Sequence, residues 1–477
     1  MKTKTQEILQ LFSQISAIPR CSGNEAALCA WLERWSTTNG FTSKVDEAGN
    51  ICIKVPASKG SESSPTVVLQ GHMDMVCEKT PDSRHDFTKD AIKNLTDGDW
   101  LVADNTTLGS DNGIAIAFAM AAAMDPSLKH PPLELLFTVK EEVGLSGVDY
   151  LQPGFISGKR LINIDSEEEG TFIVGCAGGE TTTIQLPVSL EPVTGADVFE
   201  ILVDGCRGGH SGVDIAKNFA NANKLLARAL YGLAGLGEVR IAKISGGTAH
   251  NAIPRGAKAI VTFPNGKKSD AEKYLLDLLT KAKEEHHATE KNISIQMVPA
   301  AAEKALSENT SKALIGLLNG LPSGVINMSY DMPGFVETSC NLARLEQSES
   351  VIKVITSQRG TSMSRLKEIT SRIYSIGQLA GATVTTESSY PSWNPDMSSP
   401  LLSVFKKSYS TLFNSQPKIE SIHAGLECST IGDKFPGIDM ISIGVTIENP
   451  HSPTERMYLP SLPKLWQLIA NTLEALC

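Results

Sequence analysis

The pattern of apolar and polar positions predicts buried strands and a helix in the first part of the chain. Residues 66–76, TVVLQGHMDMV, form an apolar, β-rich run that ends in polar residues, and residues 133–139 and 160–165 repeat this design. Between the first two runs, GSDNGIAIAFAMAAAMD has the length and apolar content of a helix, with Asp111 and Asn112 as capping residue types at its start. This order of elements indicates an α/β fold, in which ligands bind at the carboxyl ends of the strands.

The pattern changes at about residue 181. TTTIQLPVSL and ADVFEILVDG alternate apolar and polar residues with period two, and a helix over about 217–232 and strands near 238–245 and 257–263 follow. We expect a second strand–helix–strand unit over about 312–389, which would make the inserted region an internal duplication.

After a proline-rich segment, the chain returns to its first pattern. A helix over 401–413, an apolar strand over 440–445 and a final helix over 461–476 are expected there. A chain of 477 residues is also too long for one hydrophobic core. We therefore predict a discontinuous first domain of residues 1–180 and 390–477, with an inserted domain of residues 181–389.

Composition and charge exclude several classes of protein. Hydrophobic residues make up 41% and charged residues 20%, with a mean hydropathy of −0.07, as in a globular protein. The 43 Lys and Arg against 53 Asp and Glu give a net charge of −10, so we expect no nucleic-acid partner. The longest apolar run, Gly113 to Met124, is shorter than the roughly 20 residues of a membrane-spanning helix, so we expect no membrane contact.

The cysteines and the N-terminus indicate where the protein resides. Nine cysteines are scattered with no C-x-x-C pair, a pattern that suits a reduced compartment better than a disulfide framework and disfavours a thiolate zinc site. The first 20 residues contain polar positions that interrupt any secretory h-region and predict an amphipathic helix instead. We therefore expect a cytoplasmic protein.

Histidine and carboxylate side chains gather at the ends of the predicted strands and at loop tips of the first pattern. Imidazole and carboxylate without thiolate suit Zn²⁺, Co²⁺ or Mn²⁺ in a catalytic site that keeps a position open for water. The set consists of His72, Asp74, Asp111, Glu141, Glu142, Asp165 and His451.

Two pairs within this set predict distinct roles. Alternation along a strand puts His72 and Asp74 on one face, so that Asp74 can accept the imidazole N–H that does not face a metal. The adjacent side chains of Glu141 and Glu142 diverge, so one can bind metal while the other acts as a general base toward the bound water.

Eight segments in a fixed order carry a resemblance to a known family. GHMDMV, LGSDNGIA, TVKEEVGLSG, NIDSEE, GGHSG, HNAIPR, HAGLE and NPHSPTER, spread over the whole chain, resemble the M20 family of co-catalytic metallopeptidases. The resemblance implies an α/β fold, with a zinc-peptidase-like catalytic domain, a mixed sheet flanked by helices, and an inserted α+β lid domain.

The resemblance also implies a ligand set. Two divalent metal ions per subunit, Zn²⁺ first and Co²⁺ or Mn²⁺ as alternatives, would share Asp111 as a bridging carboxylate. His72 and Asp165 would complete one ion, and Glu142 and His451 the other. Glu141 would be the general base. Family members often have a cis peptide bond after the bridging residue, so we expect one between Asp111 and Asn112.

Four further residues are expected to act on the substrate. His210 in GGHSG would stabilise the tetrahedral oxyanion, and Arg359, with Asn251 beside it, would bind the substrate carboxylate, as the resemblance implies. Glu427 in HAGLE would face the substrate ammonium. A surface arginine and a loop-capping asparagine remain the alternative interpretation of Arg359 and Asn251.

We predict a metal-dependent dipeptidase acting on dipeptides with a free N-terminus, including Xaa-His dipeptides. The alternative within the family is an amidohydrolase that acts on N-acylated amino acids, since fold alone does not decide the substrate. A non-catalytic binding protein is a second alternative, which the presence of every ligand and of Glu141 disfavours. The expected partners are small dipeptides and a second copy of the chain in a homodimer.

Overall fold

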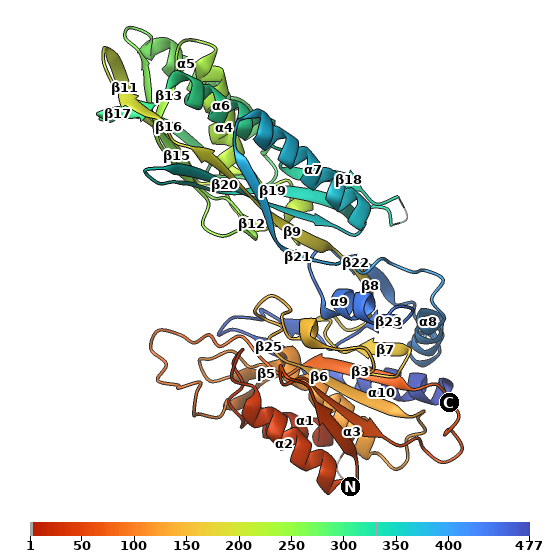
Figure 1. Cartoon of the computed structure of the whole chain (residues 1–477). Helices are drawn as coiled ribbons and strands as arrows, with labels where there is room; N and C mark the ends of the chain where they lie inside the picture. The colour runs from red at the N-terminus through yellow and green to blue at the C-terminus, as the bar shows by residue number, and fades with distance from the viewer. Residues whose placement is uncertain (1–2, 331) are drawn as a thin grey trace. The chain divides into compact units, whose positions relative to one another are not determined.

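The computed structural model describes residues 3–330 and 332–477 and divides into two compact units (Figure 1). The expected α/β fold of the first domain is confirmed, and so is the expected α+β character of the inserted region. We had expected the segment around His423 to belong to the first domain, but Ile422–Gly425 packs with the second unit, where the Ala177 N–H donates to the Ile422 carbonyl. Unit 1 consists of Met1–Cys176, Trp393–Ser421 and Leu426–Cys477, and unit 2 of Ala177–Ser392 and Ile422–Gly425.

An eight-stranded mixed sheet forms the centre of unit 1. Its strand order is β1-β2-β6-β3-β7-β23-β8-β22, and β6, β3, β7 and β23 are parallel. The carboxyl ends of these four strands therefore meet at one edge of the sheet. The strands are β1 (Thr42–Val45), β2 (Ile51–Val55), β3 (Val67–His72), β6 (Leu133–Thr138), β7 (Arg160–Asn163), β8 (Thr171–Cys176), β22 (Lys418–Ile422) and β23 (Asp439–Ser442).

Helices and a smaller sheet complete this unit. The helices are α1 (Lys4–Ser16), α2 (Ala26–Thr38), α3 (Ser110–Met124), α8 (Pro400–Phe413), α9 (Glu427–Lys434), α10 (Ser461–Ala475) and the short 3₁₀ helix η1 (Val148–Tyr150). A four-stranded sheet has the order β24 (Ile447–Glu448), β25 (Arg456–Tyr458), β5 (Trp100–Ala103) and β4 (Asn94–Asp97).

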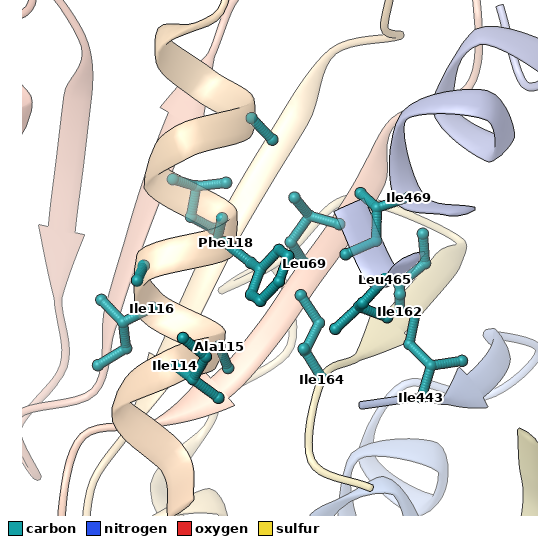
Figure 2. Packing of buried hydrophobic residues seen from close by; sticks show 14 of the residues in the cluster. Leu69, Ile114, Ala115, Ile116, Phe118, Ile162, Ile164, Ile443, Leu465 and Ile469 are labelled. Carbon is teal, nitrogen blue, oxygen red and sulfur yellow. The ribbon is translucent and has the colours of Figure 1, made fainter. Parts of the chain in front are cut away.

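Helix α3 lies in the hydrophobic core of unit 1 because it is apolar on all sides. Figure 2 shows Phe118 of α3 among Leu69 of β3 and Ile162 of β7, with Leu465 and Ile469 of α10 nearby. This packing fixes the start of α3 against the end of β3, where the polar residues begin.

The approach of α3 to β3 requires a glycine. A Cβ atom at Gly71 would lie 2.3 Å from Asn112 Oδ1 and 2.5 Å from the Ala115 Cβ. Any larger residue at position 71 would therefore separate the two elements that carry His72 and Asp111.

Unit 2 contains a nine-stranded sheet. Helices α4, α5, α6 and α7 lie side by side along one face (Figure 1) and share one core with the strands. The main path of the sheet runs β16 (Ser294–Pro299), β11 (Ala196–Asp204), β15 (Ala257–Pro264), β13 (Arg240–Gly246), β19 (Val336–Gln347), β20 (Val351–Gly360), β9 (Gly178–Pro187) and β21 (Thr383–Tyr390), with β18 (Gly324–Met328) beside β19.

The remaining elements of this unit are short strands and helices. Two ribbons pair β10 (Leu190–Pro192) with β17 (Lys304–Leu306), and β12 (Gly209–His210) with β14 (Ala252–Ile253). The helices are α4 (Ala222–Ala234), α5 (Lys268–Glu285), α6 (Glu308–Gly320), α7 (Met363–Leu379) and the 3₁₀ helix η2 (Ile215–Lys217).

The strand order of the large sheet is the same from either edge. From one edge, β16, β11, β15 and β13 are the fourth, first, third and second strands of one β-α-β-β-α-β segment. From the other edge, β21, β9, β20 and β19 have the same order in a second segment. Strand β9, which we had grouped with the segment that follows it, pairs instead with β20 and β21. The first segment is thus inserted into the second, after β9.

A disulfide joins Cys21 to Cys77, with Cα atoms 5.7 Å apart. The expectation that the cysteines are reduced is wrong for this pair. The reason is a long-range contact, because residue 21 pairs in a β-bridge with Met75 and the two sulfur atoms are thereby brought together. The other seven cysteines are free, and six of them are buried. No helix in the described part of the chain is long and apolar enough to cross a membrane.

Candidate functional site

The parallel strands of unit 1 deliver the predicted polar residues to one edge of the sheet. His72 is the last residue of β3, Asp165 follows the end of β7, and Glu141 and Glu142 follow the end of β6. Asp111 arrives from the first turn of α3, which packs on β3.

Asp111 lies between two groups of side chains. Its Oδ1 atom is 3.0 Å from His72 Nε2, and its Oδ2 atom is 3.1 Å from His451 Nε2. His72 Nε2 is also 3.6 Å from Asp165 Oδ1, and His451 Nε2 is 3.0 Å from Glu142 Oε2. The structure thus brings together all five predicted metal ligands, with one carboxylate shared by two groups.

These residues fit divalent cations by donor type and by charge. Two sets, His72 with Asp111 and Asp165, and Asp111 with Glu142 and His451, each offer ligand atoms within 4.8 Å of one another. Glu142 Oε1 is buried and has no hydrogen-bond partner in the described structure, as expected for an oxygen that faces an ion. A third set of such atoms comes from His72, Glu141 and Glu142.

The electrostatics of the site favour a bound positive charge. Burial, together with neighbouring carboxylates, holds the pKa of Asp165 and that of Glu141 well above their usual values. Hydrogen bonds from His451 to Asp111 and Glu142 raise the pKa of this half-exposed histidine to about 11. The cluster therefore contains more carboxyl groups than its two imidazoles can balance in the ionised form, and a bound cation would favour their ionisation.

Asp74 is buried beneath His72 and contacts three segments of the site. Its Oδ1 lies 3.2 Å from His72 Nδ1 and accepts the Glu141 N–H at 3.0 Å. Its Oδ2 accepts the Glu142 N–H at 3.2 Å and the Ser22 hydroxyl at 2.7 Å. One carboxylate thus orients the imidazole and also fixes the backbone of the glutamate pair.

The peptide bond between Asp111 and Asn112 is cis, which confirms the expectation for this position. The expected capping role of these two residues is wrong, because the residue at the N-cap position is Gly109, and Asp111 and Asn112 have non-helical backbone angles within the first turn. Instead, Asn112 Oδ1 accepts the His72 N–H at 3.1 Å, and its Nδ2 donates to the Ile164 carbonyl at 2.8 Å. Asn112 therefore ties the end of β3 to the segment that leads to Asp165.

In unit 2, the β12–β14 ribbon carries His210. Nδ1 of this ring accepts the N–H groups of Gly212 at 3.3 Å and Val213 at 3.2 Å. The proton of the neutral ring is therefore on Nε2, which is free to donate. Burial and the charge of Arg359 lower the pKa of His210 to about 4, so the ring is neutral near pH 7.

Arg359, on β20, is 8% exposed. Its Nη1 donates to the Tyr390 hydroxyl at 2.9 Å, whereas its Nε has no partner and no carboxylate forms an ion pair with it in the described part of the chain. Burial and the charge of Arg359 lower the pKa of His423 to about 3. A buried guanidinium without a counter-ion, beside neutral histidines, is suited to an anionic group of a ligand.

The other two predicted substrate residues lie in different environments. Asn251 is exposed beside the ribbon, and its carbonyl accepts the Ser211 N–H at 2.8 Å, next to His210. Glu427 is fully buried in unit 1, where it accepts hydrogen bonds from Gln70 at 2.6 Å and Thr138 at 2.7 Å. Burial raises the pKa of Glu427 to about 7.

Several residues that contact the polar side chains described above were not predicted from the sequence. Ser22 donates to Asp74, Tyr390 accepts from Arg359, and Ser339 contacts His423 at 2.8 Å. Serine and tyrosine are common surface residues, so composition gave no signal. Only their contacts with residues from distant segments, which the folded structure shows, reveal their place in the site.

Comparisons with known proteins show the family to which the chain belongs. The family model described as Peptidase family M20/M25/M40 matches residues 68–475. The cytosol non-specific dipeptidase of Escherichia coli is 40% identical over 472 residues, which cover 98% of this chain and 97% of that protein. The crystal structure of aminoacylhistidine dipeptidase from Vibrio alginolyticus superimposes with a TM-score of 0.91 at 36% identity, covering 98% of this chain and 96% of that one.

A more distant structure, a tripeptidase from Staphylococcus aureus, has a TM-score of 0.59 at 17% identity, covers 99% of this chain and 98% of that one, and shows the fold alone. The prediction of a metallopeptidase is confirmed by the family match and by these two closely similar relatives. The chain therefore belongs to the M20/M25/M40 family of peptidases.

Proposed function

We propose that the protein is a dinuclear metal-dependent dipeptidase that hydrolyses dipeptides with a free N-terminus, including Xaa-His dipeptides. The position of Asp111 carries the proposal, because its two oxygens face two separate histidine–carboxylate groups. The names of the Escherichia coli and Vibrio alginolyticus relatives support a dipeptide substrate.

In this proposal His72, Asp111 and Asp165 hold one ion, and Asp111, Glu142 and His451 hold the other. When bound, two divalent ions supply Lewis acidity, which polarises the scissile carbonyl and lowers the pKa of a water molecule toward neutrality. Zn²⁺ is the first candidate by donor type, and Co²⁺ and Mn²⁺ suit the same ligands.

Glu141 is the proposed general base. Its carboxylate lies with Glu142 and His72 in one group of side chains, and its backbone N–H is held by Asp74. The carboxylate takes a proton from the attacking water and later delivers it to the leaving amine, so the peptide bond is broken with no net change in Glu141. Asp74 keeps the His72 ring in one orientation throughout.

His210 and Arg359 are proposed to act on charges of the substrate. The Nε2–H of the neutral His210 ring donates a hydrogen bond to the oxyanion that forms from the carbonyl. Arg359, which lacks a carboxylate partner among the described residues, binds the free α-carboxylate of the dipeptide. Asn251, exposed beside the same ribbon, supplies a further polar contact.

Glu427 is the least direct member of the proposed set. We had expected it to face the substrate ammonium, and its full burial instead supports an electrostatic influence on the neighbouring carboxylates. Removing its charge by Glu427→Gln should change the pH profile of turnover more than the KM for dipeptides.

The test is hydrolysis of β-Ala-His and several α-dipeptides, each beside its N-acetylated form, by metal-loaded and by chelated protein. The proposal predicts cleavage of the free dipeptides alone, with activity lost on chelation and restored by Zn²⁺, Co²⁺ or Mn²⁺. Cleavage of the acetylated forms would assign the protein to the amidohydrolases of N-acylated amino acids. Turnover that survives complete metal removal would contradict the metal mechanism.

We propose a cytoplasmic location, which the name of the Escherichia coli relative supports. The Cys21–Cys77 disulfide is the feature that this proposal must accommodate, because disulfides are rare in a reducing cytosol. Fractionation of cells combined with thiol labelling before lysis would establish both the compartment and the state of the pair.

We also propose that two copies form a homodimer. The large sheet of unit 2 ends in strands β16 and β21, each of which has a neighbouring strand on one side only among the described strands. Sedimentation velocity would give the mass of the particle, and a monomer at micromolar concentration would contradict the proposal.

A further inference from the structure

Two charged side chains that belong to no predicted set are buried beside the ligand cluster of unit 1. Arg20 and Glu455 are each 2% exposed. Burying a charge is costly unless hydrogen bonds compensate it. The partners of these two residues therefore indicate what their burial accomplishes.

Arg20 binds backbone carbonyls on two different segments. Its Nη1 donates to the Met73 and Asp74 carbonyls, each at 2.9 Å, directly after the metal-ligand candidate His72. Its Nη2 donates to the Gly109 carbonyl, two residues before Asp111. One planar guanidinium thus holds the end of β3 and the start of α3 together.

Glu455 binds the same segment of α3 from another direction. Its Oε2 accepts the N–H groups of Leu108 at 2.8 Å and Gly109 at 2.9 Å. Its Oε1 accepts the Ser110 N–H at 2.8 Å, the Ser110 hydroxyl at 2.6 Å and the Asp111 N–H at 3.3 Å. A single carboxylate therefore satisfies four successive N–H groups, from Leu108 before the helix to Asp111 in its first turn.

Gly109 is the point at which the two side chains meet the backbone. Its N–H binds Glu455 and its carbonyl binds Arg20. It has a φ of +67°, and a Cβ there would lie 2.6 Å from Arg20 Nη2. Only glycine allows the two contacts at one residue without displacing the guanidinium.

The contacts link three segments that bear predicted ligands. Arg20 joins the segment of His72 to that of Asp111, and Glu455 joins the segment of Asp111 to the loop that carries His451 four residues earlier. Asp111 has to meet one histidine with each carboxylate oxygen. Glu455 binds the Asp111 N–H and Arg20 binds the Gly109 carbonyl, so the segment that leads to Asp111 is held by two groups that are not ligands themselves.

We propose that Arg20 and Glu455 are positioning residues of the metal centre, which place Asp111 so that its carboxylate can bridge two ions. The proposal rests on the dinuclear site proposed above. Loss of either residue leaves every ligand present and displaces the shared one, so the affinity for the metal pair falls.

The experiment compares Glu455→Gln, Arg20→Lys and the milder Ser110→Ala with a matched control, Glu134→Gln. Glu134 is also 2% exposed and accepts the Ser157 N–H at 2.7 Å, the Gly158 N–H at 3.0 Å and the Ser157 hydroxyl at 2.8 Å, on a strand end without ligands. The control therefore loses a carboxylate of equal burial and similar bonding, but it does not touch the ligand segments.

The primary readout is the dissociation constant of each Zn²⁺ ion, from competition with a chromogenic chelator on metal-free protein. We expect Glu455→Gln and Arg20→Lys to weaken binding of at least one ion about 10- to 100-fold, as for other groups that orient metal ligands. Ser110→Ala should weaken it less, and Glu134→Gln should leave both constants unchanged. At saturating metal, kcat should fall in the first two variants with little change in KM.

Unfolding temperatures of the metal-free proteins separate positioning from general stabilisation. If Glu455→Gln and Arg20→Lys lower the unfolding temperature as Glu134→Gln does but bind Zn²⁺ as the wild type does, the proposal is wrong. If Glu455→Gln does not fold, unchanged affinity in both Arg20→Lys and Ser110→Ala overturns it. A wild-type protein that binds fewer than two ions would instead refute the dinuclear site itself.

Discussion

The two units of the molecule contain polar clusters of opposite character. In unit 1, carboxylates outnumber imidazoles around Asp111, and burial raises the pKa of Asp165 and of Glu141. In unit 2, Arg359 has no carboxylate partner in the described structure, and burial beside it lowers the pKa of His210 and of His423. The first cluster is therefore suited to cations and the second to an anion, so the two units offer sites for opposite charges.

The clusters also differ in how they are fixed. Asp74, Asn112, Arg20 and Glu455 hold the first one through backbone groups, and a disulfide lies next to it. The cluster of unit 2 lies on long strands and on a ribbon of two short strands, and the Nε–H group of Arg359 has no hydrogen-bond partner in the described structure. We therefore expect the reaction itself, which needs fixed side-chain positions, to take place at the cluster of unit 1. We expect the cluster of unit 2 to bind an anionic group with less strict geometry.

Removing the general base should have the largest effect. Glu141→Gln keeps the shape of the side chain but cannot take a proton, so kcat should fall about 10²- to 10⁴-fold. Metal content, measured by inductively coupled plasma mass spectrometry, should stay at the wild-type level. The comparison variant His72→Ala removes a ligand and should lose both activity and metal. Equal metal loss in the two variants would contradict the assignment of the base.

Breaking the disulfide should lower the stability of unit 1. Cys21 and Cys77 are separated by 56 residues, and the double variant Cys21→Ser/Cys77→Ser should reduce the free energy of unfolding by about 2–4 kcal/mol. Urea unfolding without reductant measures this difference. Thiol titration of the unfolded wild type should find seven free thiols before reduction and nine after it. Nine thiols before reduction would show that the bond does not form.

Substitution of Arg359, which has no carboxylate partner in the described structure, should weaken binding of the substrate carboxylate. Arg359→Lys keeps the charge but loses the planar fork, and kcat/KM for free dipeptides should fall about 10- to 100-fold. The wild type should discriminate against C-terminally amidated dipeptides, and the variant, which keeps the charge but loses the bidentate contact, should discriminate less. Arg365→Ala, which removes an exposed arginine paired with Glu337, is the control and should leave this preference intact.

The neutral histidines of unit 2 should make stability depend on pH. The pKa of His423 is about 3 and that of His210 about 4, both lowered by burial, whereas an unfolded histidine titrates near 6.5. Between these values the unfolded state binds more protons, so the free energy of unfolding falls as pH drops from about 6.5 toward 4. Each histidine contributes a slope of at most about 1.4 kcal/mol per pH unit.

Denaturant unfolding at pH 4.5–7 measures this slope in the wild type and in His423→Asn. The variant should be less dependent on pH over that interval, although it also loses the contact with Ser339. Identical slopes in the two proteins would show that His423 is not buried as a neutral ring.

The sequence predicted local structure and the candidate His and carboxylate residues because both depend on short-range patterns, whereas the division of these residues into metal ligands and base followed from the resemblance to the M20 family. TVVLQGHMDMV predicts a strand, and His72 ends it; the glutamate pair and Asp165 follow the next strands in the same manner. The parallel arrangement then brings these residues to one edge without further information.

Long-range contacts could not be predicted in this way. The alternation of β9 is the same whichever strand it pairs with, and only the fold selects β20 and β21 as its neighbours. The Cys21–Cys77 bond depends on a β-bridge between segments more than 50 residues apart. Arginine and glutamate are usually surface residues, so nothing in the sequence indicates that Arg20 and Glu455 are buried. Their burial is possible because carbonyls and N–H groups from distant segments bind their charges.

The most direct test of the account is turnover of one free dipeptide during stepwise addition of Zn²⁺ to fully chelated protein. If Asp111 bridges two ions, hydrolysis should be absent at the start and should reach its plateau only after two equivalents per chain are bound. Full activity with one equivalent, or activity in the chelated protein, would contradict the central claim that two ions share this carboxylate.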